Sequence, residues 1–96
     1  MNFQIVVKKK SMDAINELPE KPRRFIFDAL KSLEENPWPG TDGDKEKLHL
    51  ADTVDIYRLH IGRSYTVLYT IDTKEDLIRV HDVMTIEQAH KKYGRL

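Results

Sequence analysis

The 96-residue sequence has no cysteine, no net charge and no long apolar segment. Without cysteine, the chain forms no disulfide and offers no thiolate ligand to a metal ion. Sixteen basic residues balance sixteen acidic ones, whereas a nucleic-acid-binding domain usually carries a net positive charge. The longest apolar run falls far short of the roughly 20 residues that cross a bilayer, and we expect no signal peptide ahead of the first strand. These absences predict a single cytoplasmic domain over residues 1–96 that does not contact a membrane.

The charges are distributed unevenly along the chain. Residues 57–96 carry seven basic and five acidic residues, together with three of the four histidines. Local clusters of charge steer an anion more strongly than the total charge does. We therefore expect an anion-binding site among the cations of this part, which are Arg58, His60, Arg63, Arg79, His81, His90, Lys91, Lys92 and Arg95.

The segment 57–72 predicts a β-hairpin, because apolar and polar residues alternate through it on both sides of one glycine. A two-residue turn would mix apolar and polar side chains on both faces. A three-residue loop at 62–64 leaves one face apolar, so we expect its register, which pairs Ile61 with Tyr65, Leu59 with Val67 and Tyr57 with Tyr69. The other face is mixed and should be partly covered or occupied; it holds Ile56, Arg58, His60, Thr66, Leu68 and Thr70.

The remaining segments complete an α+β fold. At the N-terminal end we expect a strand at 2–8, then a helix capped by Ser11 and ended by Pro19, and then a helix over 22–36. A loop over 36–47 should lead to strands at 54–61, 65–71 and 77–83. The last element should be a helix from Thr85 to Gly94 that opens with a capping box. The first two helices should form an antiparallel hairpin on the apolar sheet face. The last three strands should form an antiparallel meander that completes a four-stranded sheet. Trp38, between two prolines, is expected to pack over the edge of the core.

If Ile71 opposes Ile78, then Arg79 and His81 join Arg58 and His60 on the mixed face, with Leu68 between Arg58 and His81. Cations beside imidazoles on a rigid sheet suit chemistry on a phosphate. The structural alternatives are that Arg58 pairs with Asp55 or Asp82, and that the helix dipole favours the cations of the last helical turn. Zinc binding by His60, His81 and His90 lacks a short-spaced ligand pair, and we expect no metal and no cofactor.

One string of residues resembles the RelE/ParE superfamily of toxins from toxin–antitoxin systems. It comprises Leu33, Asn36-Pro37-x-Pro39, Lys47-Leu48, Tyr57-Arg58, Ile61-Gly62, Tyr65-x-Val67, Tyr69 and Ile71-Asp72. The resemblance implies a RelE-like fold and a RelB-like antitoxin as partner. RelE-like members cut messenger RNA in the ribosomal A site, whereas ParE-like members poison DNA gyrase.

The resemblance also implies roles for individual residues. Arg58 and His60 fall where RelE-like toxins carry basic residues on a middle strand, and Tyr93 falls near their terminal tyrosine. Two positions depart from the pattern, because Thr66 replaces a common arginine and Met84 and Thr85 occupy the place of another. The catalytic hypothesis is that Arg58 and Arg79 hold the scissile phosphate, His60 or His81 acts as acid or base, and Tyr93 stacks on a base or assists proton transfer. Further RNA contacts are expected from Arg63, Lys91, Lys92 and Arg95.

Three functions stay open at this point. The basic face with histidines favours a ribosome-dependent endoribonuclease that uses 2′-hydroxyl attack on the phosphodiester. A ParE-like gyrase inhibitor would bind without chemistry of its own. The two missing arginines and the zero net charge favour an inactive member that serves as a protein-binding module.

Overall fold

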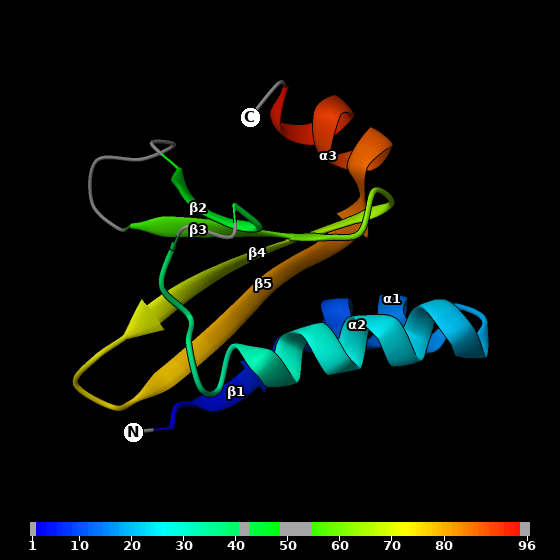
Figure 1. Ribbon diagram of the computed structural model, residues 1–96. Helices are drawn as coiled ribbons and strands as arrows, with labels where there is room; N and C mark the ends of the chain where they lie inside the picture. The colour runs from blue at the N-terminus through cyan, green and yellow to red at the C-terminus, as the bar shows by residue number, and fades with distance from the viewer. Residues whose placement is uncertain (1, 41–42, 49–54, 95–96) are drawn as a thin grey trace.

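The computed structural model describes residues 2–40, 43–48 and 55–94 as a five-stranded sheet with helices on both faces (Figure 1). The elements in chain order are β1 (Gln4–Val7), α1 (Lys9–Asn16), α2 (Glu20–Ser32), β2 (Lys45–Leu48), β3 (Ile56–Ile61), β4 (Tyr65–Asp72), β5 (Leu77–Thr85) and α3 (Ile86–Tyr93). Among the described residues, no helix is long and apolar enough to cross a membrane. The α+β class and the order of the predicted elements are confirmed.

The sheet has the strand order β1-β5-β4-β3-β2, in which β1 runs parallel to β5 and every other pair is antiparallel. The expectation of four strands was wrong, because β2 adds an edge strand inside the segment expected to be a loop. Three of the four residues of β2 are charged, so the segment shows neither the alternation of apolar and polar residues nor the β-branched residues that predict a strand. The strand expected at 54–61 begins at Ile56, and position 54 lies outside the described residues.

The predicted hairpin register is confirmed. Ile61 pairs with Tyr65, Leu59 with Val67 and Tyr57 with Tyr69, and Ile71 also opposes Ile78. The three-residue loop depends on Gly62, whose φ of +59° lies in the left-handed region. A Cβ at this position would also lie 3.5 Å from the ring of Phe25 on α2, so the hairpin tip packs directly against that helix.

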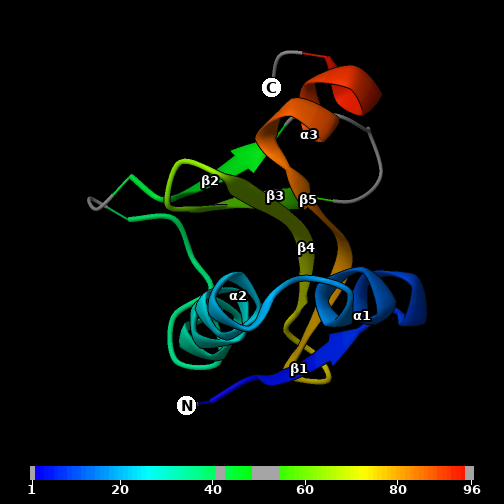
Figure 2. The same ribbon diagram turned by 90° about the vertical axis from the view of Figure 1, so that its right-hand side faces the viewer.

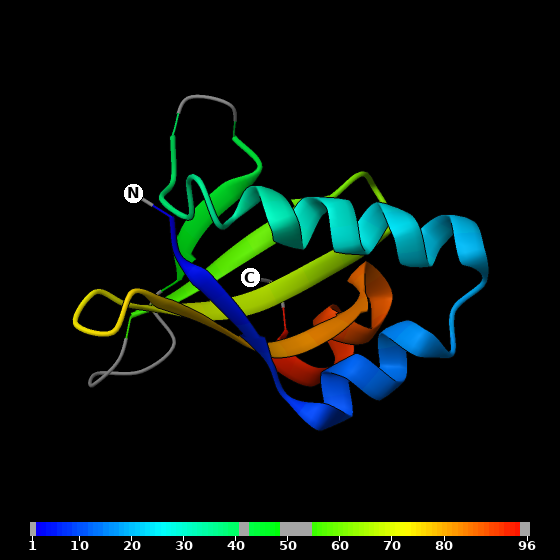
Figure 3. The same ribbon diagram turned by 90° about the horizontal axis from the view of Figure 1, so that it is seen from below.

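The helical hairpin is confirmed, but its helix starts differ from those predicted (Figure 3). Ser11 does not cap α1, because the helix already begins at Lys9. The Ser11 hydroxyl instead donates a hydrogen bond of 3.1 Å to the His81 carbonyl oxygen. The second helix begins at Glu20, so Pro22 lies in its first turn, where the missing N–H group is harmless. It ends at Ser32, earlier than the expected residue 36.

The main core lies between this hairpin and one face of the sheet, the helix face (Figure 2). Ile26 and Leu33 are fully buried there, as are Val67, Tyr69 and Val80. The Tyr69 hydroxyl donates to the Pro37 carbonyl oxygen at 2.7 Å, which ties the chain after α2 to β4. At the core edge, Trp38 packs edge-on against Phe3 and Tyr57, as expected.

The opposite face, the outer face, is covered in part by α3 (Figure 1). A second cluster forms beneath this helix from Leu48, Leu68, Met84 and Ala89, with Ile56 and Tyr93 at its margin. The predicted capping box is confirmed, since the Thr85 hydroxyl accepts from the Gln88 N–H and the Gln88 side chain accepts from the Thr85 N–H. The helix ends at Tyr93, and Gly94 caps it with a φ of +74°. The prediction that the mixed face is partly covered is therefore confirmed.

A β-bulge interrupts the pairing of β4 with β5. Leu68 pairs with Asp82 and Tyr69 pairs with Val80, so His81 is the extra residue. The prediction that Leu68 separates Arg58 from His81 was wrong by this one position, because Asp82 stands opposite Leu68. A bulge inserts an unpaired residue and redirects its side chain. It allows His81 and Asp82, neighbours in sequence, both to contact groups on the outer face.

Candidate functional site

One row of paired residues crosses the outer face and organises the predicted site. Glu46, Arg58, Leu68 and Asp82 stand opposite one another on β2, β3, β4 and β5. Neighbouring strands lie about 4.8 Å apart, so Arg58 and Asp82 are separated by about 10 Å of backbone with Leu68 between them. The row therefore divides the polar side chains into two clusters.

The first cluster is the Glu46 triad, which consists of Glu46, Arg58 and His60. Arg58 Nη2 donates to Glu46 Oε1, and His60 Nε2 lies 3.2 Å from the same oxygen. The Arg58 side chain is only 10% exposed, and its Nε is buried without a partner among the described residues. The hydrogen bond from Arg58 lowers the pKa of Glu46 and His60 adds to this effect, while burial opposes it. Glu46 is therefore ionised at neutral pH.

The triad can accept a proton and can stabilise negative charge. An imidazole held by a carboxylate is a good general base, because the carboxylate orients the ring and stabilises its protonated form. The His60 side chain is 34% exposed, so a substrate can reach it. Arg58 supplies a fixed positive charge on the neighbouring position of the same face.

Sequence reasoning missed Glu46. The expected partners of Arg58 were Asp55 and Asp82, but Asp55 pairs with Lys47 at 3.3 Å and Asp82 pairs with Lys92 at 2.8 Å. Glu46 was assigned to a loop, where it had no register relative to Arg58. One weak signal was available, since Glu46 stands two residues before Leu48 and strand periodicity would place both on one face.

The second cluster is the Asp82 cluster, in which Asp82 holds Lys92, Tyr93 and Lys10. The Tyr93 hydroxyl donates to Asp82 Oδ2 at 2.7 Å, Lys92 Nζ donates to the same oxygen at 2.8 Å, and Lys10 Nζ lies 4.0 Å from Oδ1. Burial alone would raise the pKa of Asp82, but the hydrogen bonds from Lys92 and Tyr93 outweigh it and the pKa is lowered. Burial and Asp82 both raise the pKa of Tyr93, so its hydroxyl keeps its proton.

His81 and Arg79 lie together on the far side of Leu68 from the triad. His81 Nε2 lies 2.9 Å from Thr70 Oγ1, and burial, followed by Lys8 and Arg79, lowers the pKa of His81, which is neutral at pH 7. Arg79 Nη1 donates to Asp72 Oδ2 at 3.0 Å. The structure thus brings Arg58 together with His60, and Arg79 near His81, but keeps these two pairs apart.

Two of the remaining predicted RNA contacts, Arg63 and Lys91, belong to neither cluster. Arg63 is exposed at the tip of the β3–β4 hairpin and Lys91 is exposed on α3, while position 95 lies outside the described residues. Over residues 2–40, 43–48 and 55–94, no three His, Asp or Glu side chains are grouped as a metal site, so His60, His81 and His90 do not converge.

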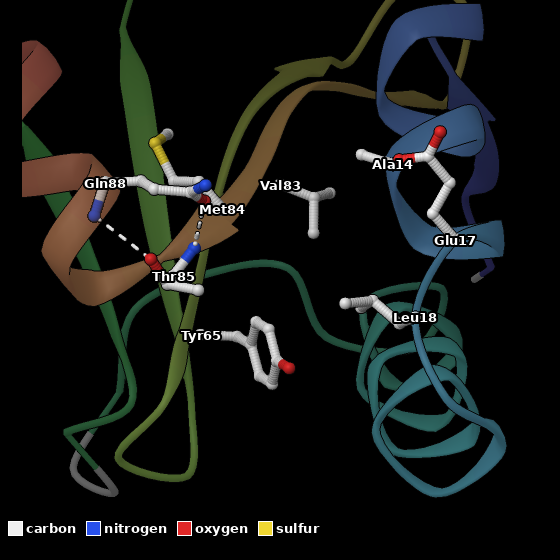
Figure 4. Close-up of a pocket in the computed structure, with 8 residues that line it drawn as sticks. All are labelled: Ala14, Glu17, Leu18, Tyr65, Val83, Met84, Thr85 and Gln88. Atoms are coloured by element: carbon white, nitrogen blue, oxygen red, sulfur yellow. Dashed lines mark hydrogen bonds between the residues drawn. The ribbon is translucent and has the colours of Figure 1, made fainter.

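A hollow of about 300 Å³ lies between α1, the ends of β4 and β5, and α3 (Figure 4). Leu18, which follows α1, and Tyr65 of β4 lie on opposite sides of it, with Val83 between them, and the Thr85–Gln88 capping box closes one side. Glu17 is its one ionisable group other than the Tyr65 phenol. This hollow lacks the paired acid, base and cation that the Glu46 triad offers, so the triad is the better candidate for chemistry.

The sequence and the fold both have recognisable relatives. The family model described as the ParE toxin of the type II toxin–antitoxin system parDE matches residues 7–89. A chain of the archaeal RelE–RelB complex from Pyrococcus horikoshii superimposes with a TM-score of 0.73 at 26% identity, over 88% of this chain and 96% of that one. No curated protein matches the sequence.

Two further solved structures share the fold at lower identity. A chain of the RelBE2 toxin–antitoxin complex from Mycobacterium tuberculosis gives a TM-score of 0.72 at 15% identity, over 88% of this chain and 99% of that one. The YoeB/ParE toxin from Agrobacterium tumefaciens gives 0.67 at 17% identity, over 86% and 98%. The family match covers most of the sequence, and the fold agrees with it. The chain belongs to the RelE/ParE superfamily and is a toxin of a toxin–antitoxin system.

Proposed function

We propose that this toxin is a ribosome-dependent endoribonuclease that cleaves messenger RNA by attack of a 2′-hydroxyl group on the adjacent phosphodiester. The observation that carries the proposal is the Glu46 triad, in which one carboxylate oxygen contacts both an imidazole and a guanidinium. The reaction needs a base for the 2′-hydroxyl proton, a cation for the charge that grows on phosphorus, and an acid for the departing 5′-oxygen. The triad offers the first two.

In the proposed mechanism, His60 takes the 2′-hydroxyl proton and Glu46 stabilises the imidazolium that forms. The 2′-oxygen then bonds to phosphorus and the bond to the 5′-oxygen breaks, which leaves a 2′,3′-cyclic phosphate. Arg58 faces the charge on the phosphoryl oxygens. The Tyr93 hydroxyl, across Leu68 in the Asp82 cluster, retains its proton and can supply it to the 5′-oxygen.

The charge balance favours RNA that is presented by a larger assembly. Arg58, Arg79 and Lys92 are all paired with carboxylates, and the chain has no net charge. A neutral protein has little long-range attraction for free RNA. A ribosome that holds messenger RNA would supply the positioning that electrostatic attraction does not.

Gyrase inhibition is the second candidate. Two observations favour it: the matching family model describes a ParE toxin, and carboxylates already neutralise most cations of the outer face. Inhibition by binding alone would not require His60 or Glu46 to be intact. An inactive member that only binds its antitoxin would show neither activity.

We also propose a RelB-like antitoxin as partner, by analogy with the RelE–RelB complex from Pyrococcus horikoshii. Leu68 offers this partner no surface, because it is 3% exposed beneath α3. The groove beside α1, α2 and the β1 edge remains open and apolar, with Val7, Met12 and Phe27 along it. An extended segment that binds an exposed strand edge is a common mode of recognition.

The test is induced expression followed by two readouts, mapping of messenger RNA ends and detection of gyrase-trapped DNA breaks. The wild-type toxin should cut messenger RNA at ribosome-occupied codons, and Glu46→Gln should reduce cutting by about 10²-fold or more. Glu20→Gln, an exposed glutamate on α2, is the matched control and should cut normally. Trapped DNA breaks without RNA cleavage would replace the proposal by gyrase inhibition.

A further inference from the structure

A further feature lies at the C-terminal end of β3, where the hairpin tip meets α2. Phe25 is the most exposed large hydrophobic side chain described, at 56%. Its ring forms one wall of a hollow of about 270 Å³, whose other walls are Pro22 of α2 and the hairpin residues Ile61 and Tyr65. Figure 3 shows the hairpin tip beside the N-terminal half of α2. An exposed aromatic ring over a hollow has a free face for a flat ligand.

The charged residues that line this hollow are basic. Lys21 and Arg63 lie on its rim, and neither has an ion-pair partner in the part of the chain that the structure describes. Arg24 lies on the other side of Phe25 together with Glu20 and Asp28, and its Nη1 is 3.9 Å from Glu20 Oε1. These cations differ from those of the outer face, because no carboxylate within residues 2–40, 43–48 and 55–94 forms an ion pair with Lys21 or Arg63, whereas Arg58, Arg79 and Lys92 each have one. The rim is therefore complementary to an anion.

We propose that the hollow between Phe25 and the β3–β4 hairpin holds a nucleotide of single-stranded RNA outside the cleaved bond. The base would stack on Phe25, and Lys21 and Arg63 would contact the phosphates on either side. Stacking on an aromatic side chain beside a basic groove is how proteins hold single strands without reading sequence. An acidic protein segment could pair with the same cations. Its aliphatic side chains, however, would not stack on the open face of the Phe25 ring as a flat base does.

The turn of the β3–β4 hairpin joins the hollow to the proposed cleavage site. His60 is the last but one residue of β3, and Arg63 follows it by three positions in the loop at 62–64. An RNA strand that leaves His60 on the outer face reaches Arg63 by crossing the hairpin tip. The inference thus rests on the proposed function and adds a second contact on the same substrate.

The test compares Phe25→Ala with Phe27→Ala, which alters the same residue type on the same helix but faces the groove beside β1. Each is combined with His60→Ala to prevent cleavage, and affinity for a fluorescent single-stranded RNA 12-mer is measured by anisotropy. Phe25→Ala should weaken binding by about fivefold or more, and Phe27→Ala should not. Lys21→Glu and Arg63→Glu should each weaken binding and reduce its salt dependence.

A stacking readout sharpens the test. In the double variant Phe25→Trp, Trp38→Phe, the single tryptophan lies at the proposed site, and RNA should quench its fluorescence. The parent chain, whose one tryptophan is Trp38, should show no such change. Unchanged RNA affinity in Phe25→Ala, or loss of antitoxin affinity alone, would overturn the nucleotide site. Phe25-dependent RNA binding by a toxin that cuts no messenger RNA would instead retain this site and reject the nuclease.

Discussion

The two faces of the sheet are held in different ways. The helix face is filled by buried aliphatic and aromatic side chains, among them Ile26, Val67 and Tyr69. The outer face alternates apolar contacts under α3 with charged groups, so that Arg58 and Leu68 stand side by side in one row. The first arrangement stabilises the fold. The second arrangement keeps ionisable groups near one another where they are partly buried, and this shifts the pKa values of Glu46, His81 and Asp82.

The largest expected loss of stability comes from a substitution in the core of the helix face. Ile26→Ala removes a fully buried side chain between α2 and the sheet, and should lower the free energy of unfolding by about 2–5 kcal/mol. Met84→Ala, in the smaller cluster under α3, should have a lesser effect because a single short helix can settle into the space. Urea denaturation of both variants measures the difference. A larger loss for Met84→Ala would reverse the assignment of the two faces.

The next effect concerns the buried charge of the outer face. Glu46→Gln leaves the Arg58 guanidinium, 10% exposed, without its carboxylate and should lower the free energy of unfolding by about 1–3 kcal/mol. Adding Arg58→Met removes the uncompensated charge and should recover most of that loss, while RNA cleavage stays absent. Recovery of activity together with stability would show that the triad has only a structural role.

A smaller effect tests how firmly α3 covers the outer face. Thr85→Ala removes the hydroxyl that accepts from the Gln88 N–H and should lower the free energy of unfolding by about 1 kcal/mol. Amide hydrogen exchange should rise mainly in α3. Exchange that rises equally in α2 would mean that the two faces are not independent.

The smallest effect is a pH dependence. The pKa of His81 is lowered from its usual 6.5, so the unfolded chain binds a proton first as pH falls, and stability declines below 6.5. Glu46 and Asp82 behave differently, because their lowered pKa values cause stability to decline only at more acidic pH. His81→Gln should therefore flatten the unfolding free energy just below pH 6.5 and leave the acid limb unchanged. A curve that matches wild type in that range would contradict the assignment.

The helix face was predictable from the sequence because its burial imposes strict alternation. A slip of one residue between Leu59 and Val67 would turn every apolar side chain to the wrong side, so one register stood out. The outer face has no such constraint. The bulge at His81 and the edge strand that carries Glu46 arise from tertiary pairing, and their local sequences resemble a regular strand and a loop. The sequence predicted that Arg58 and His60 lie together on this face, but not the carboxylate of Glu46 that both contact.

The most direct measurement is the rate of messenger RNA cleavage in a translating extract by wild-type toxin, His60→Gln and His90→Gln. His60 contacts Glu46 and is 34% exposed, whereas His90 is exposed on α3, so neither change should disturb folding. We expect His60→Gln to be slower by about 10²-fold or more and His90→Gln to match wild type. Equal rates for all three proteins would contradict the claim that the Glu46 triad performs the chemistry.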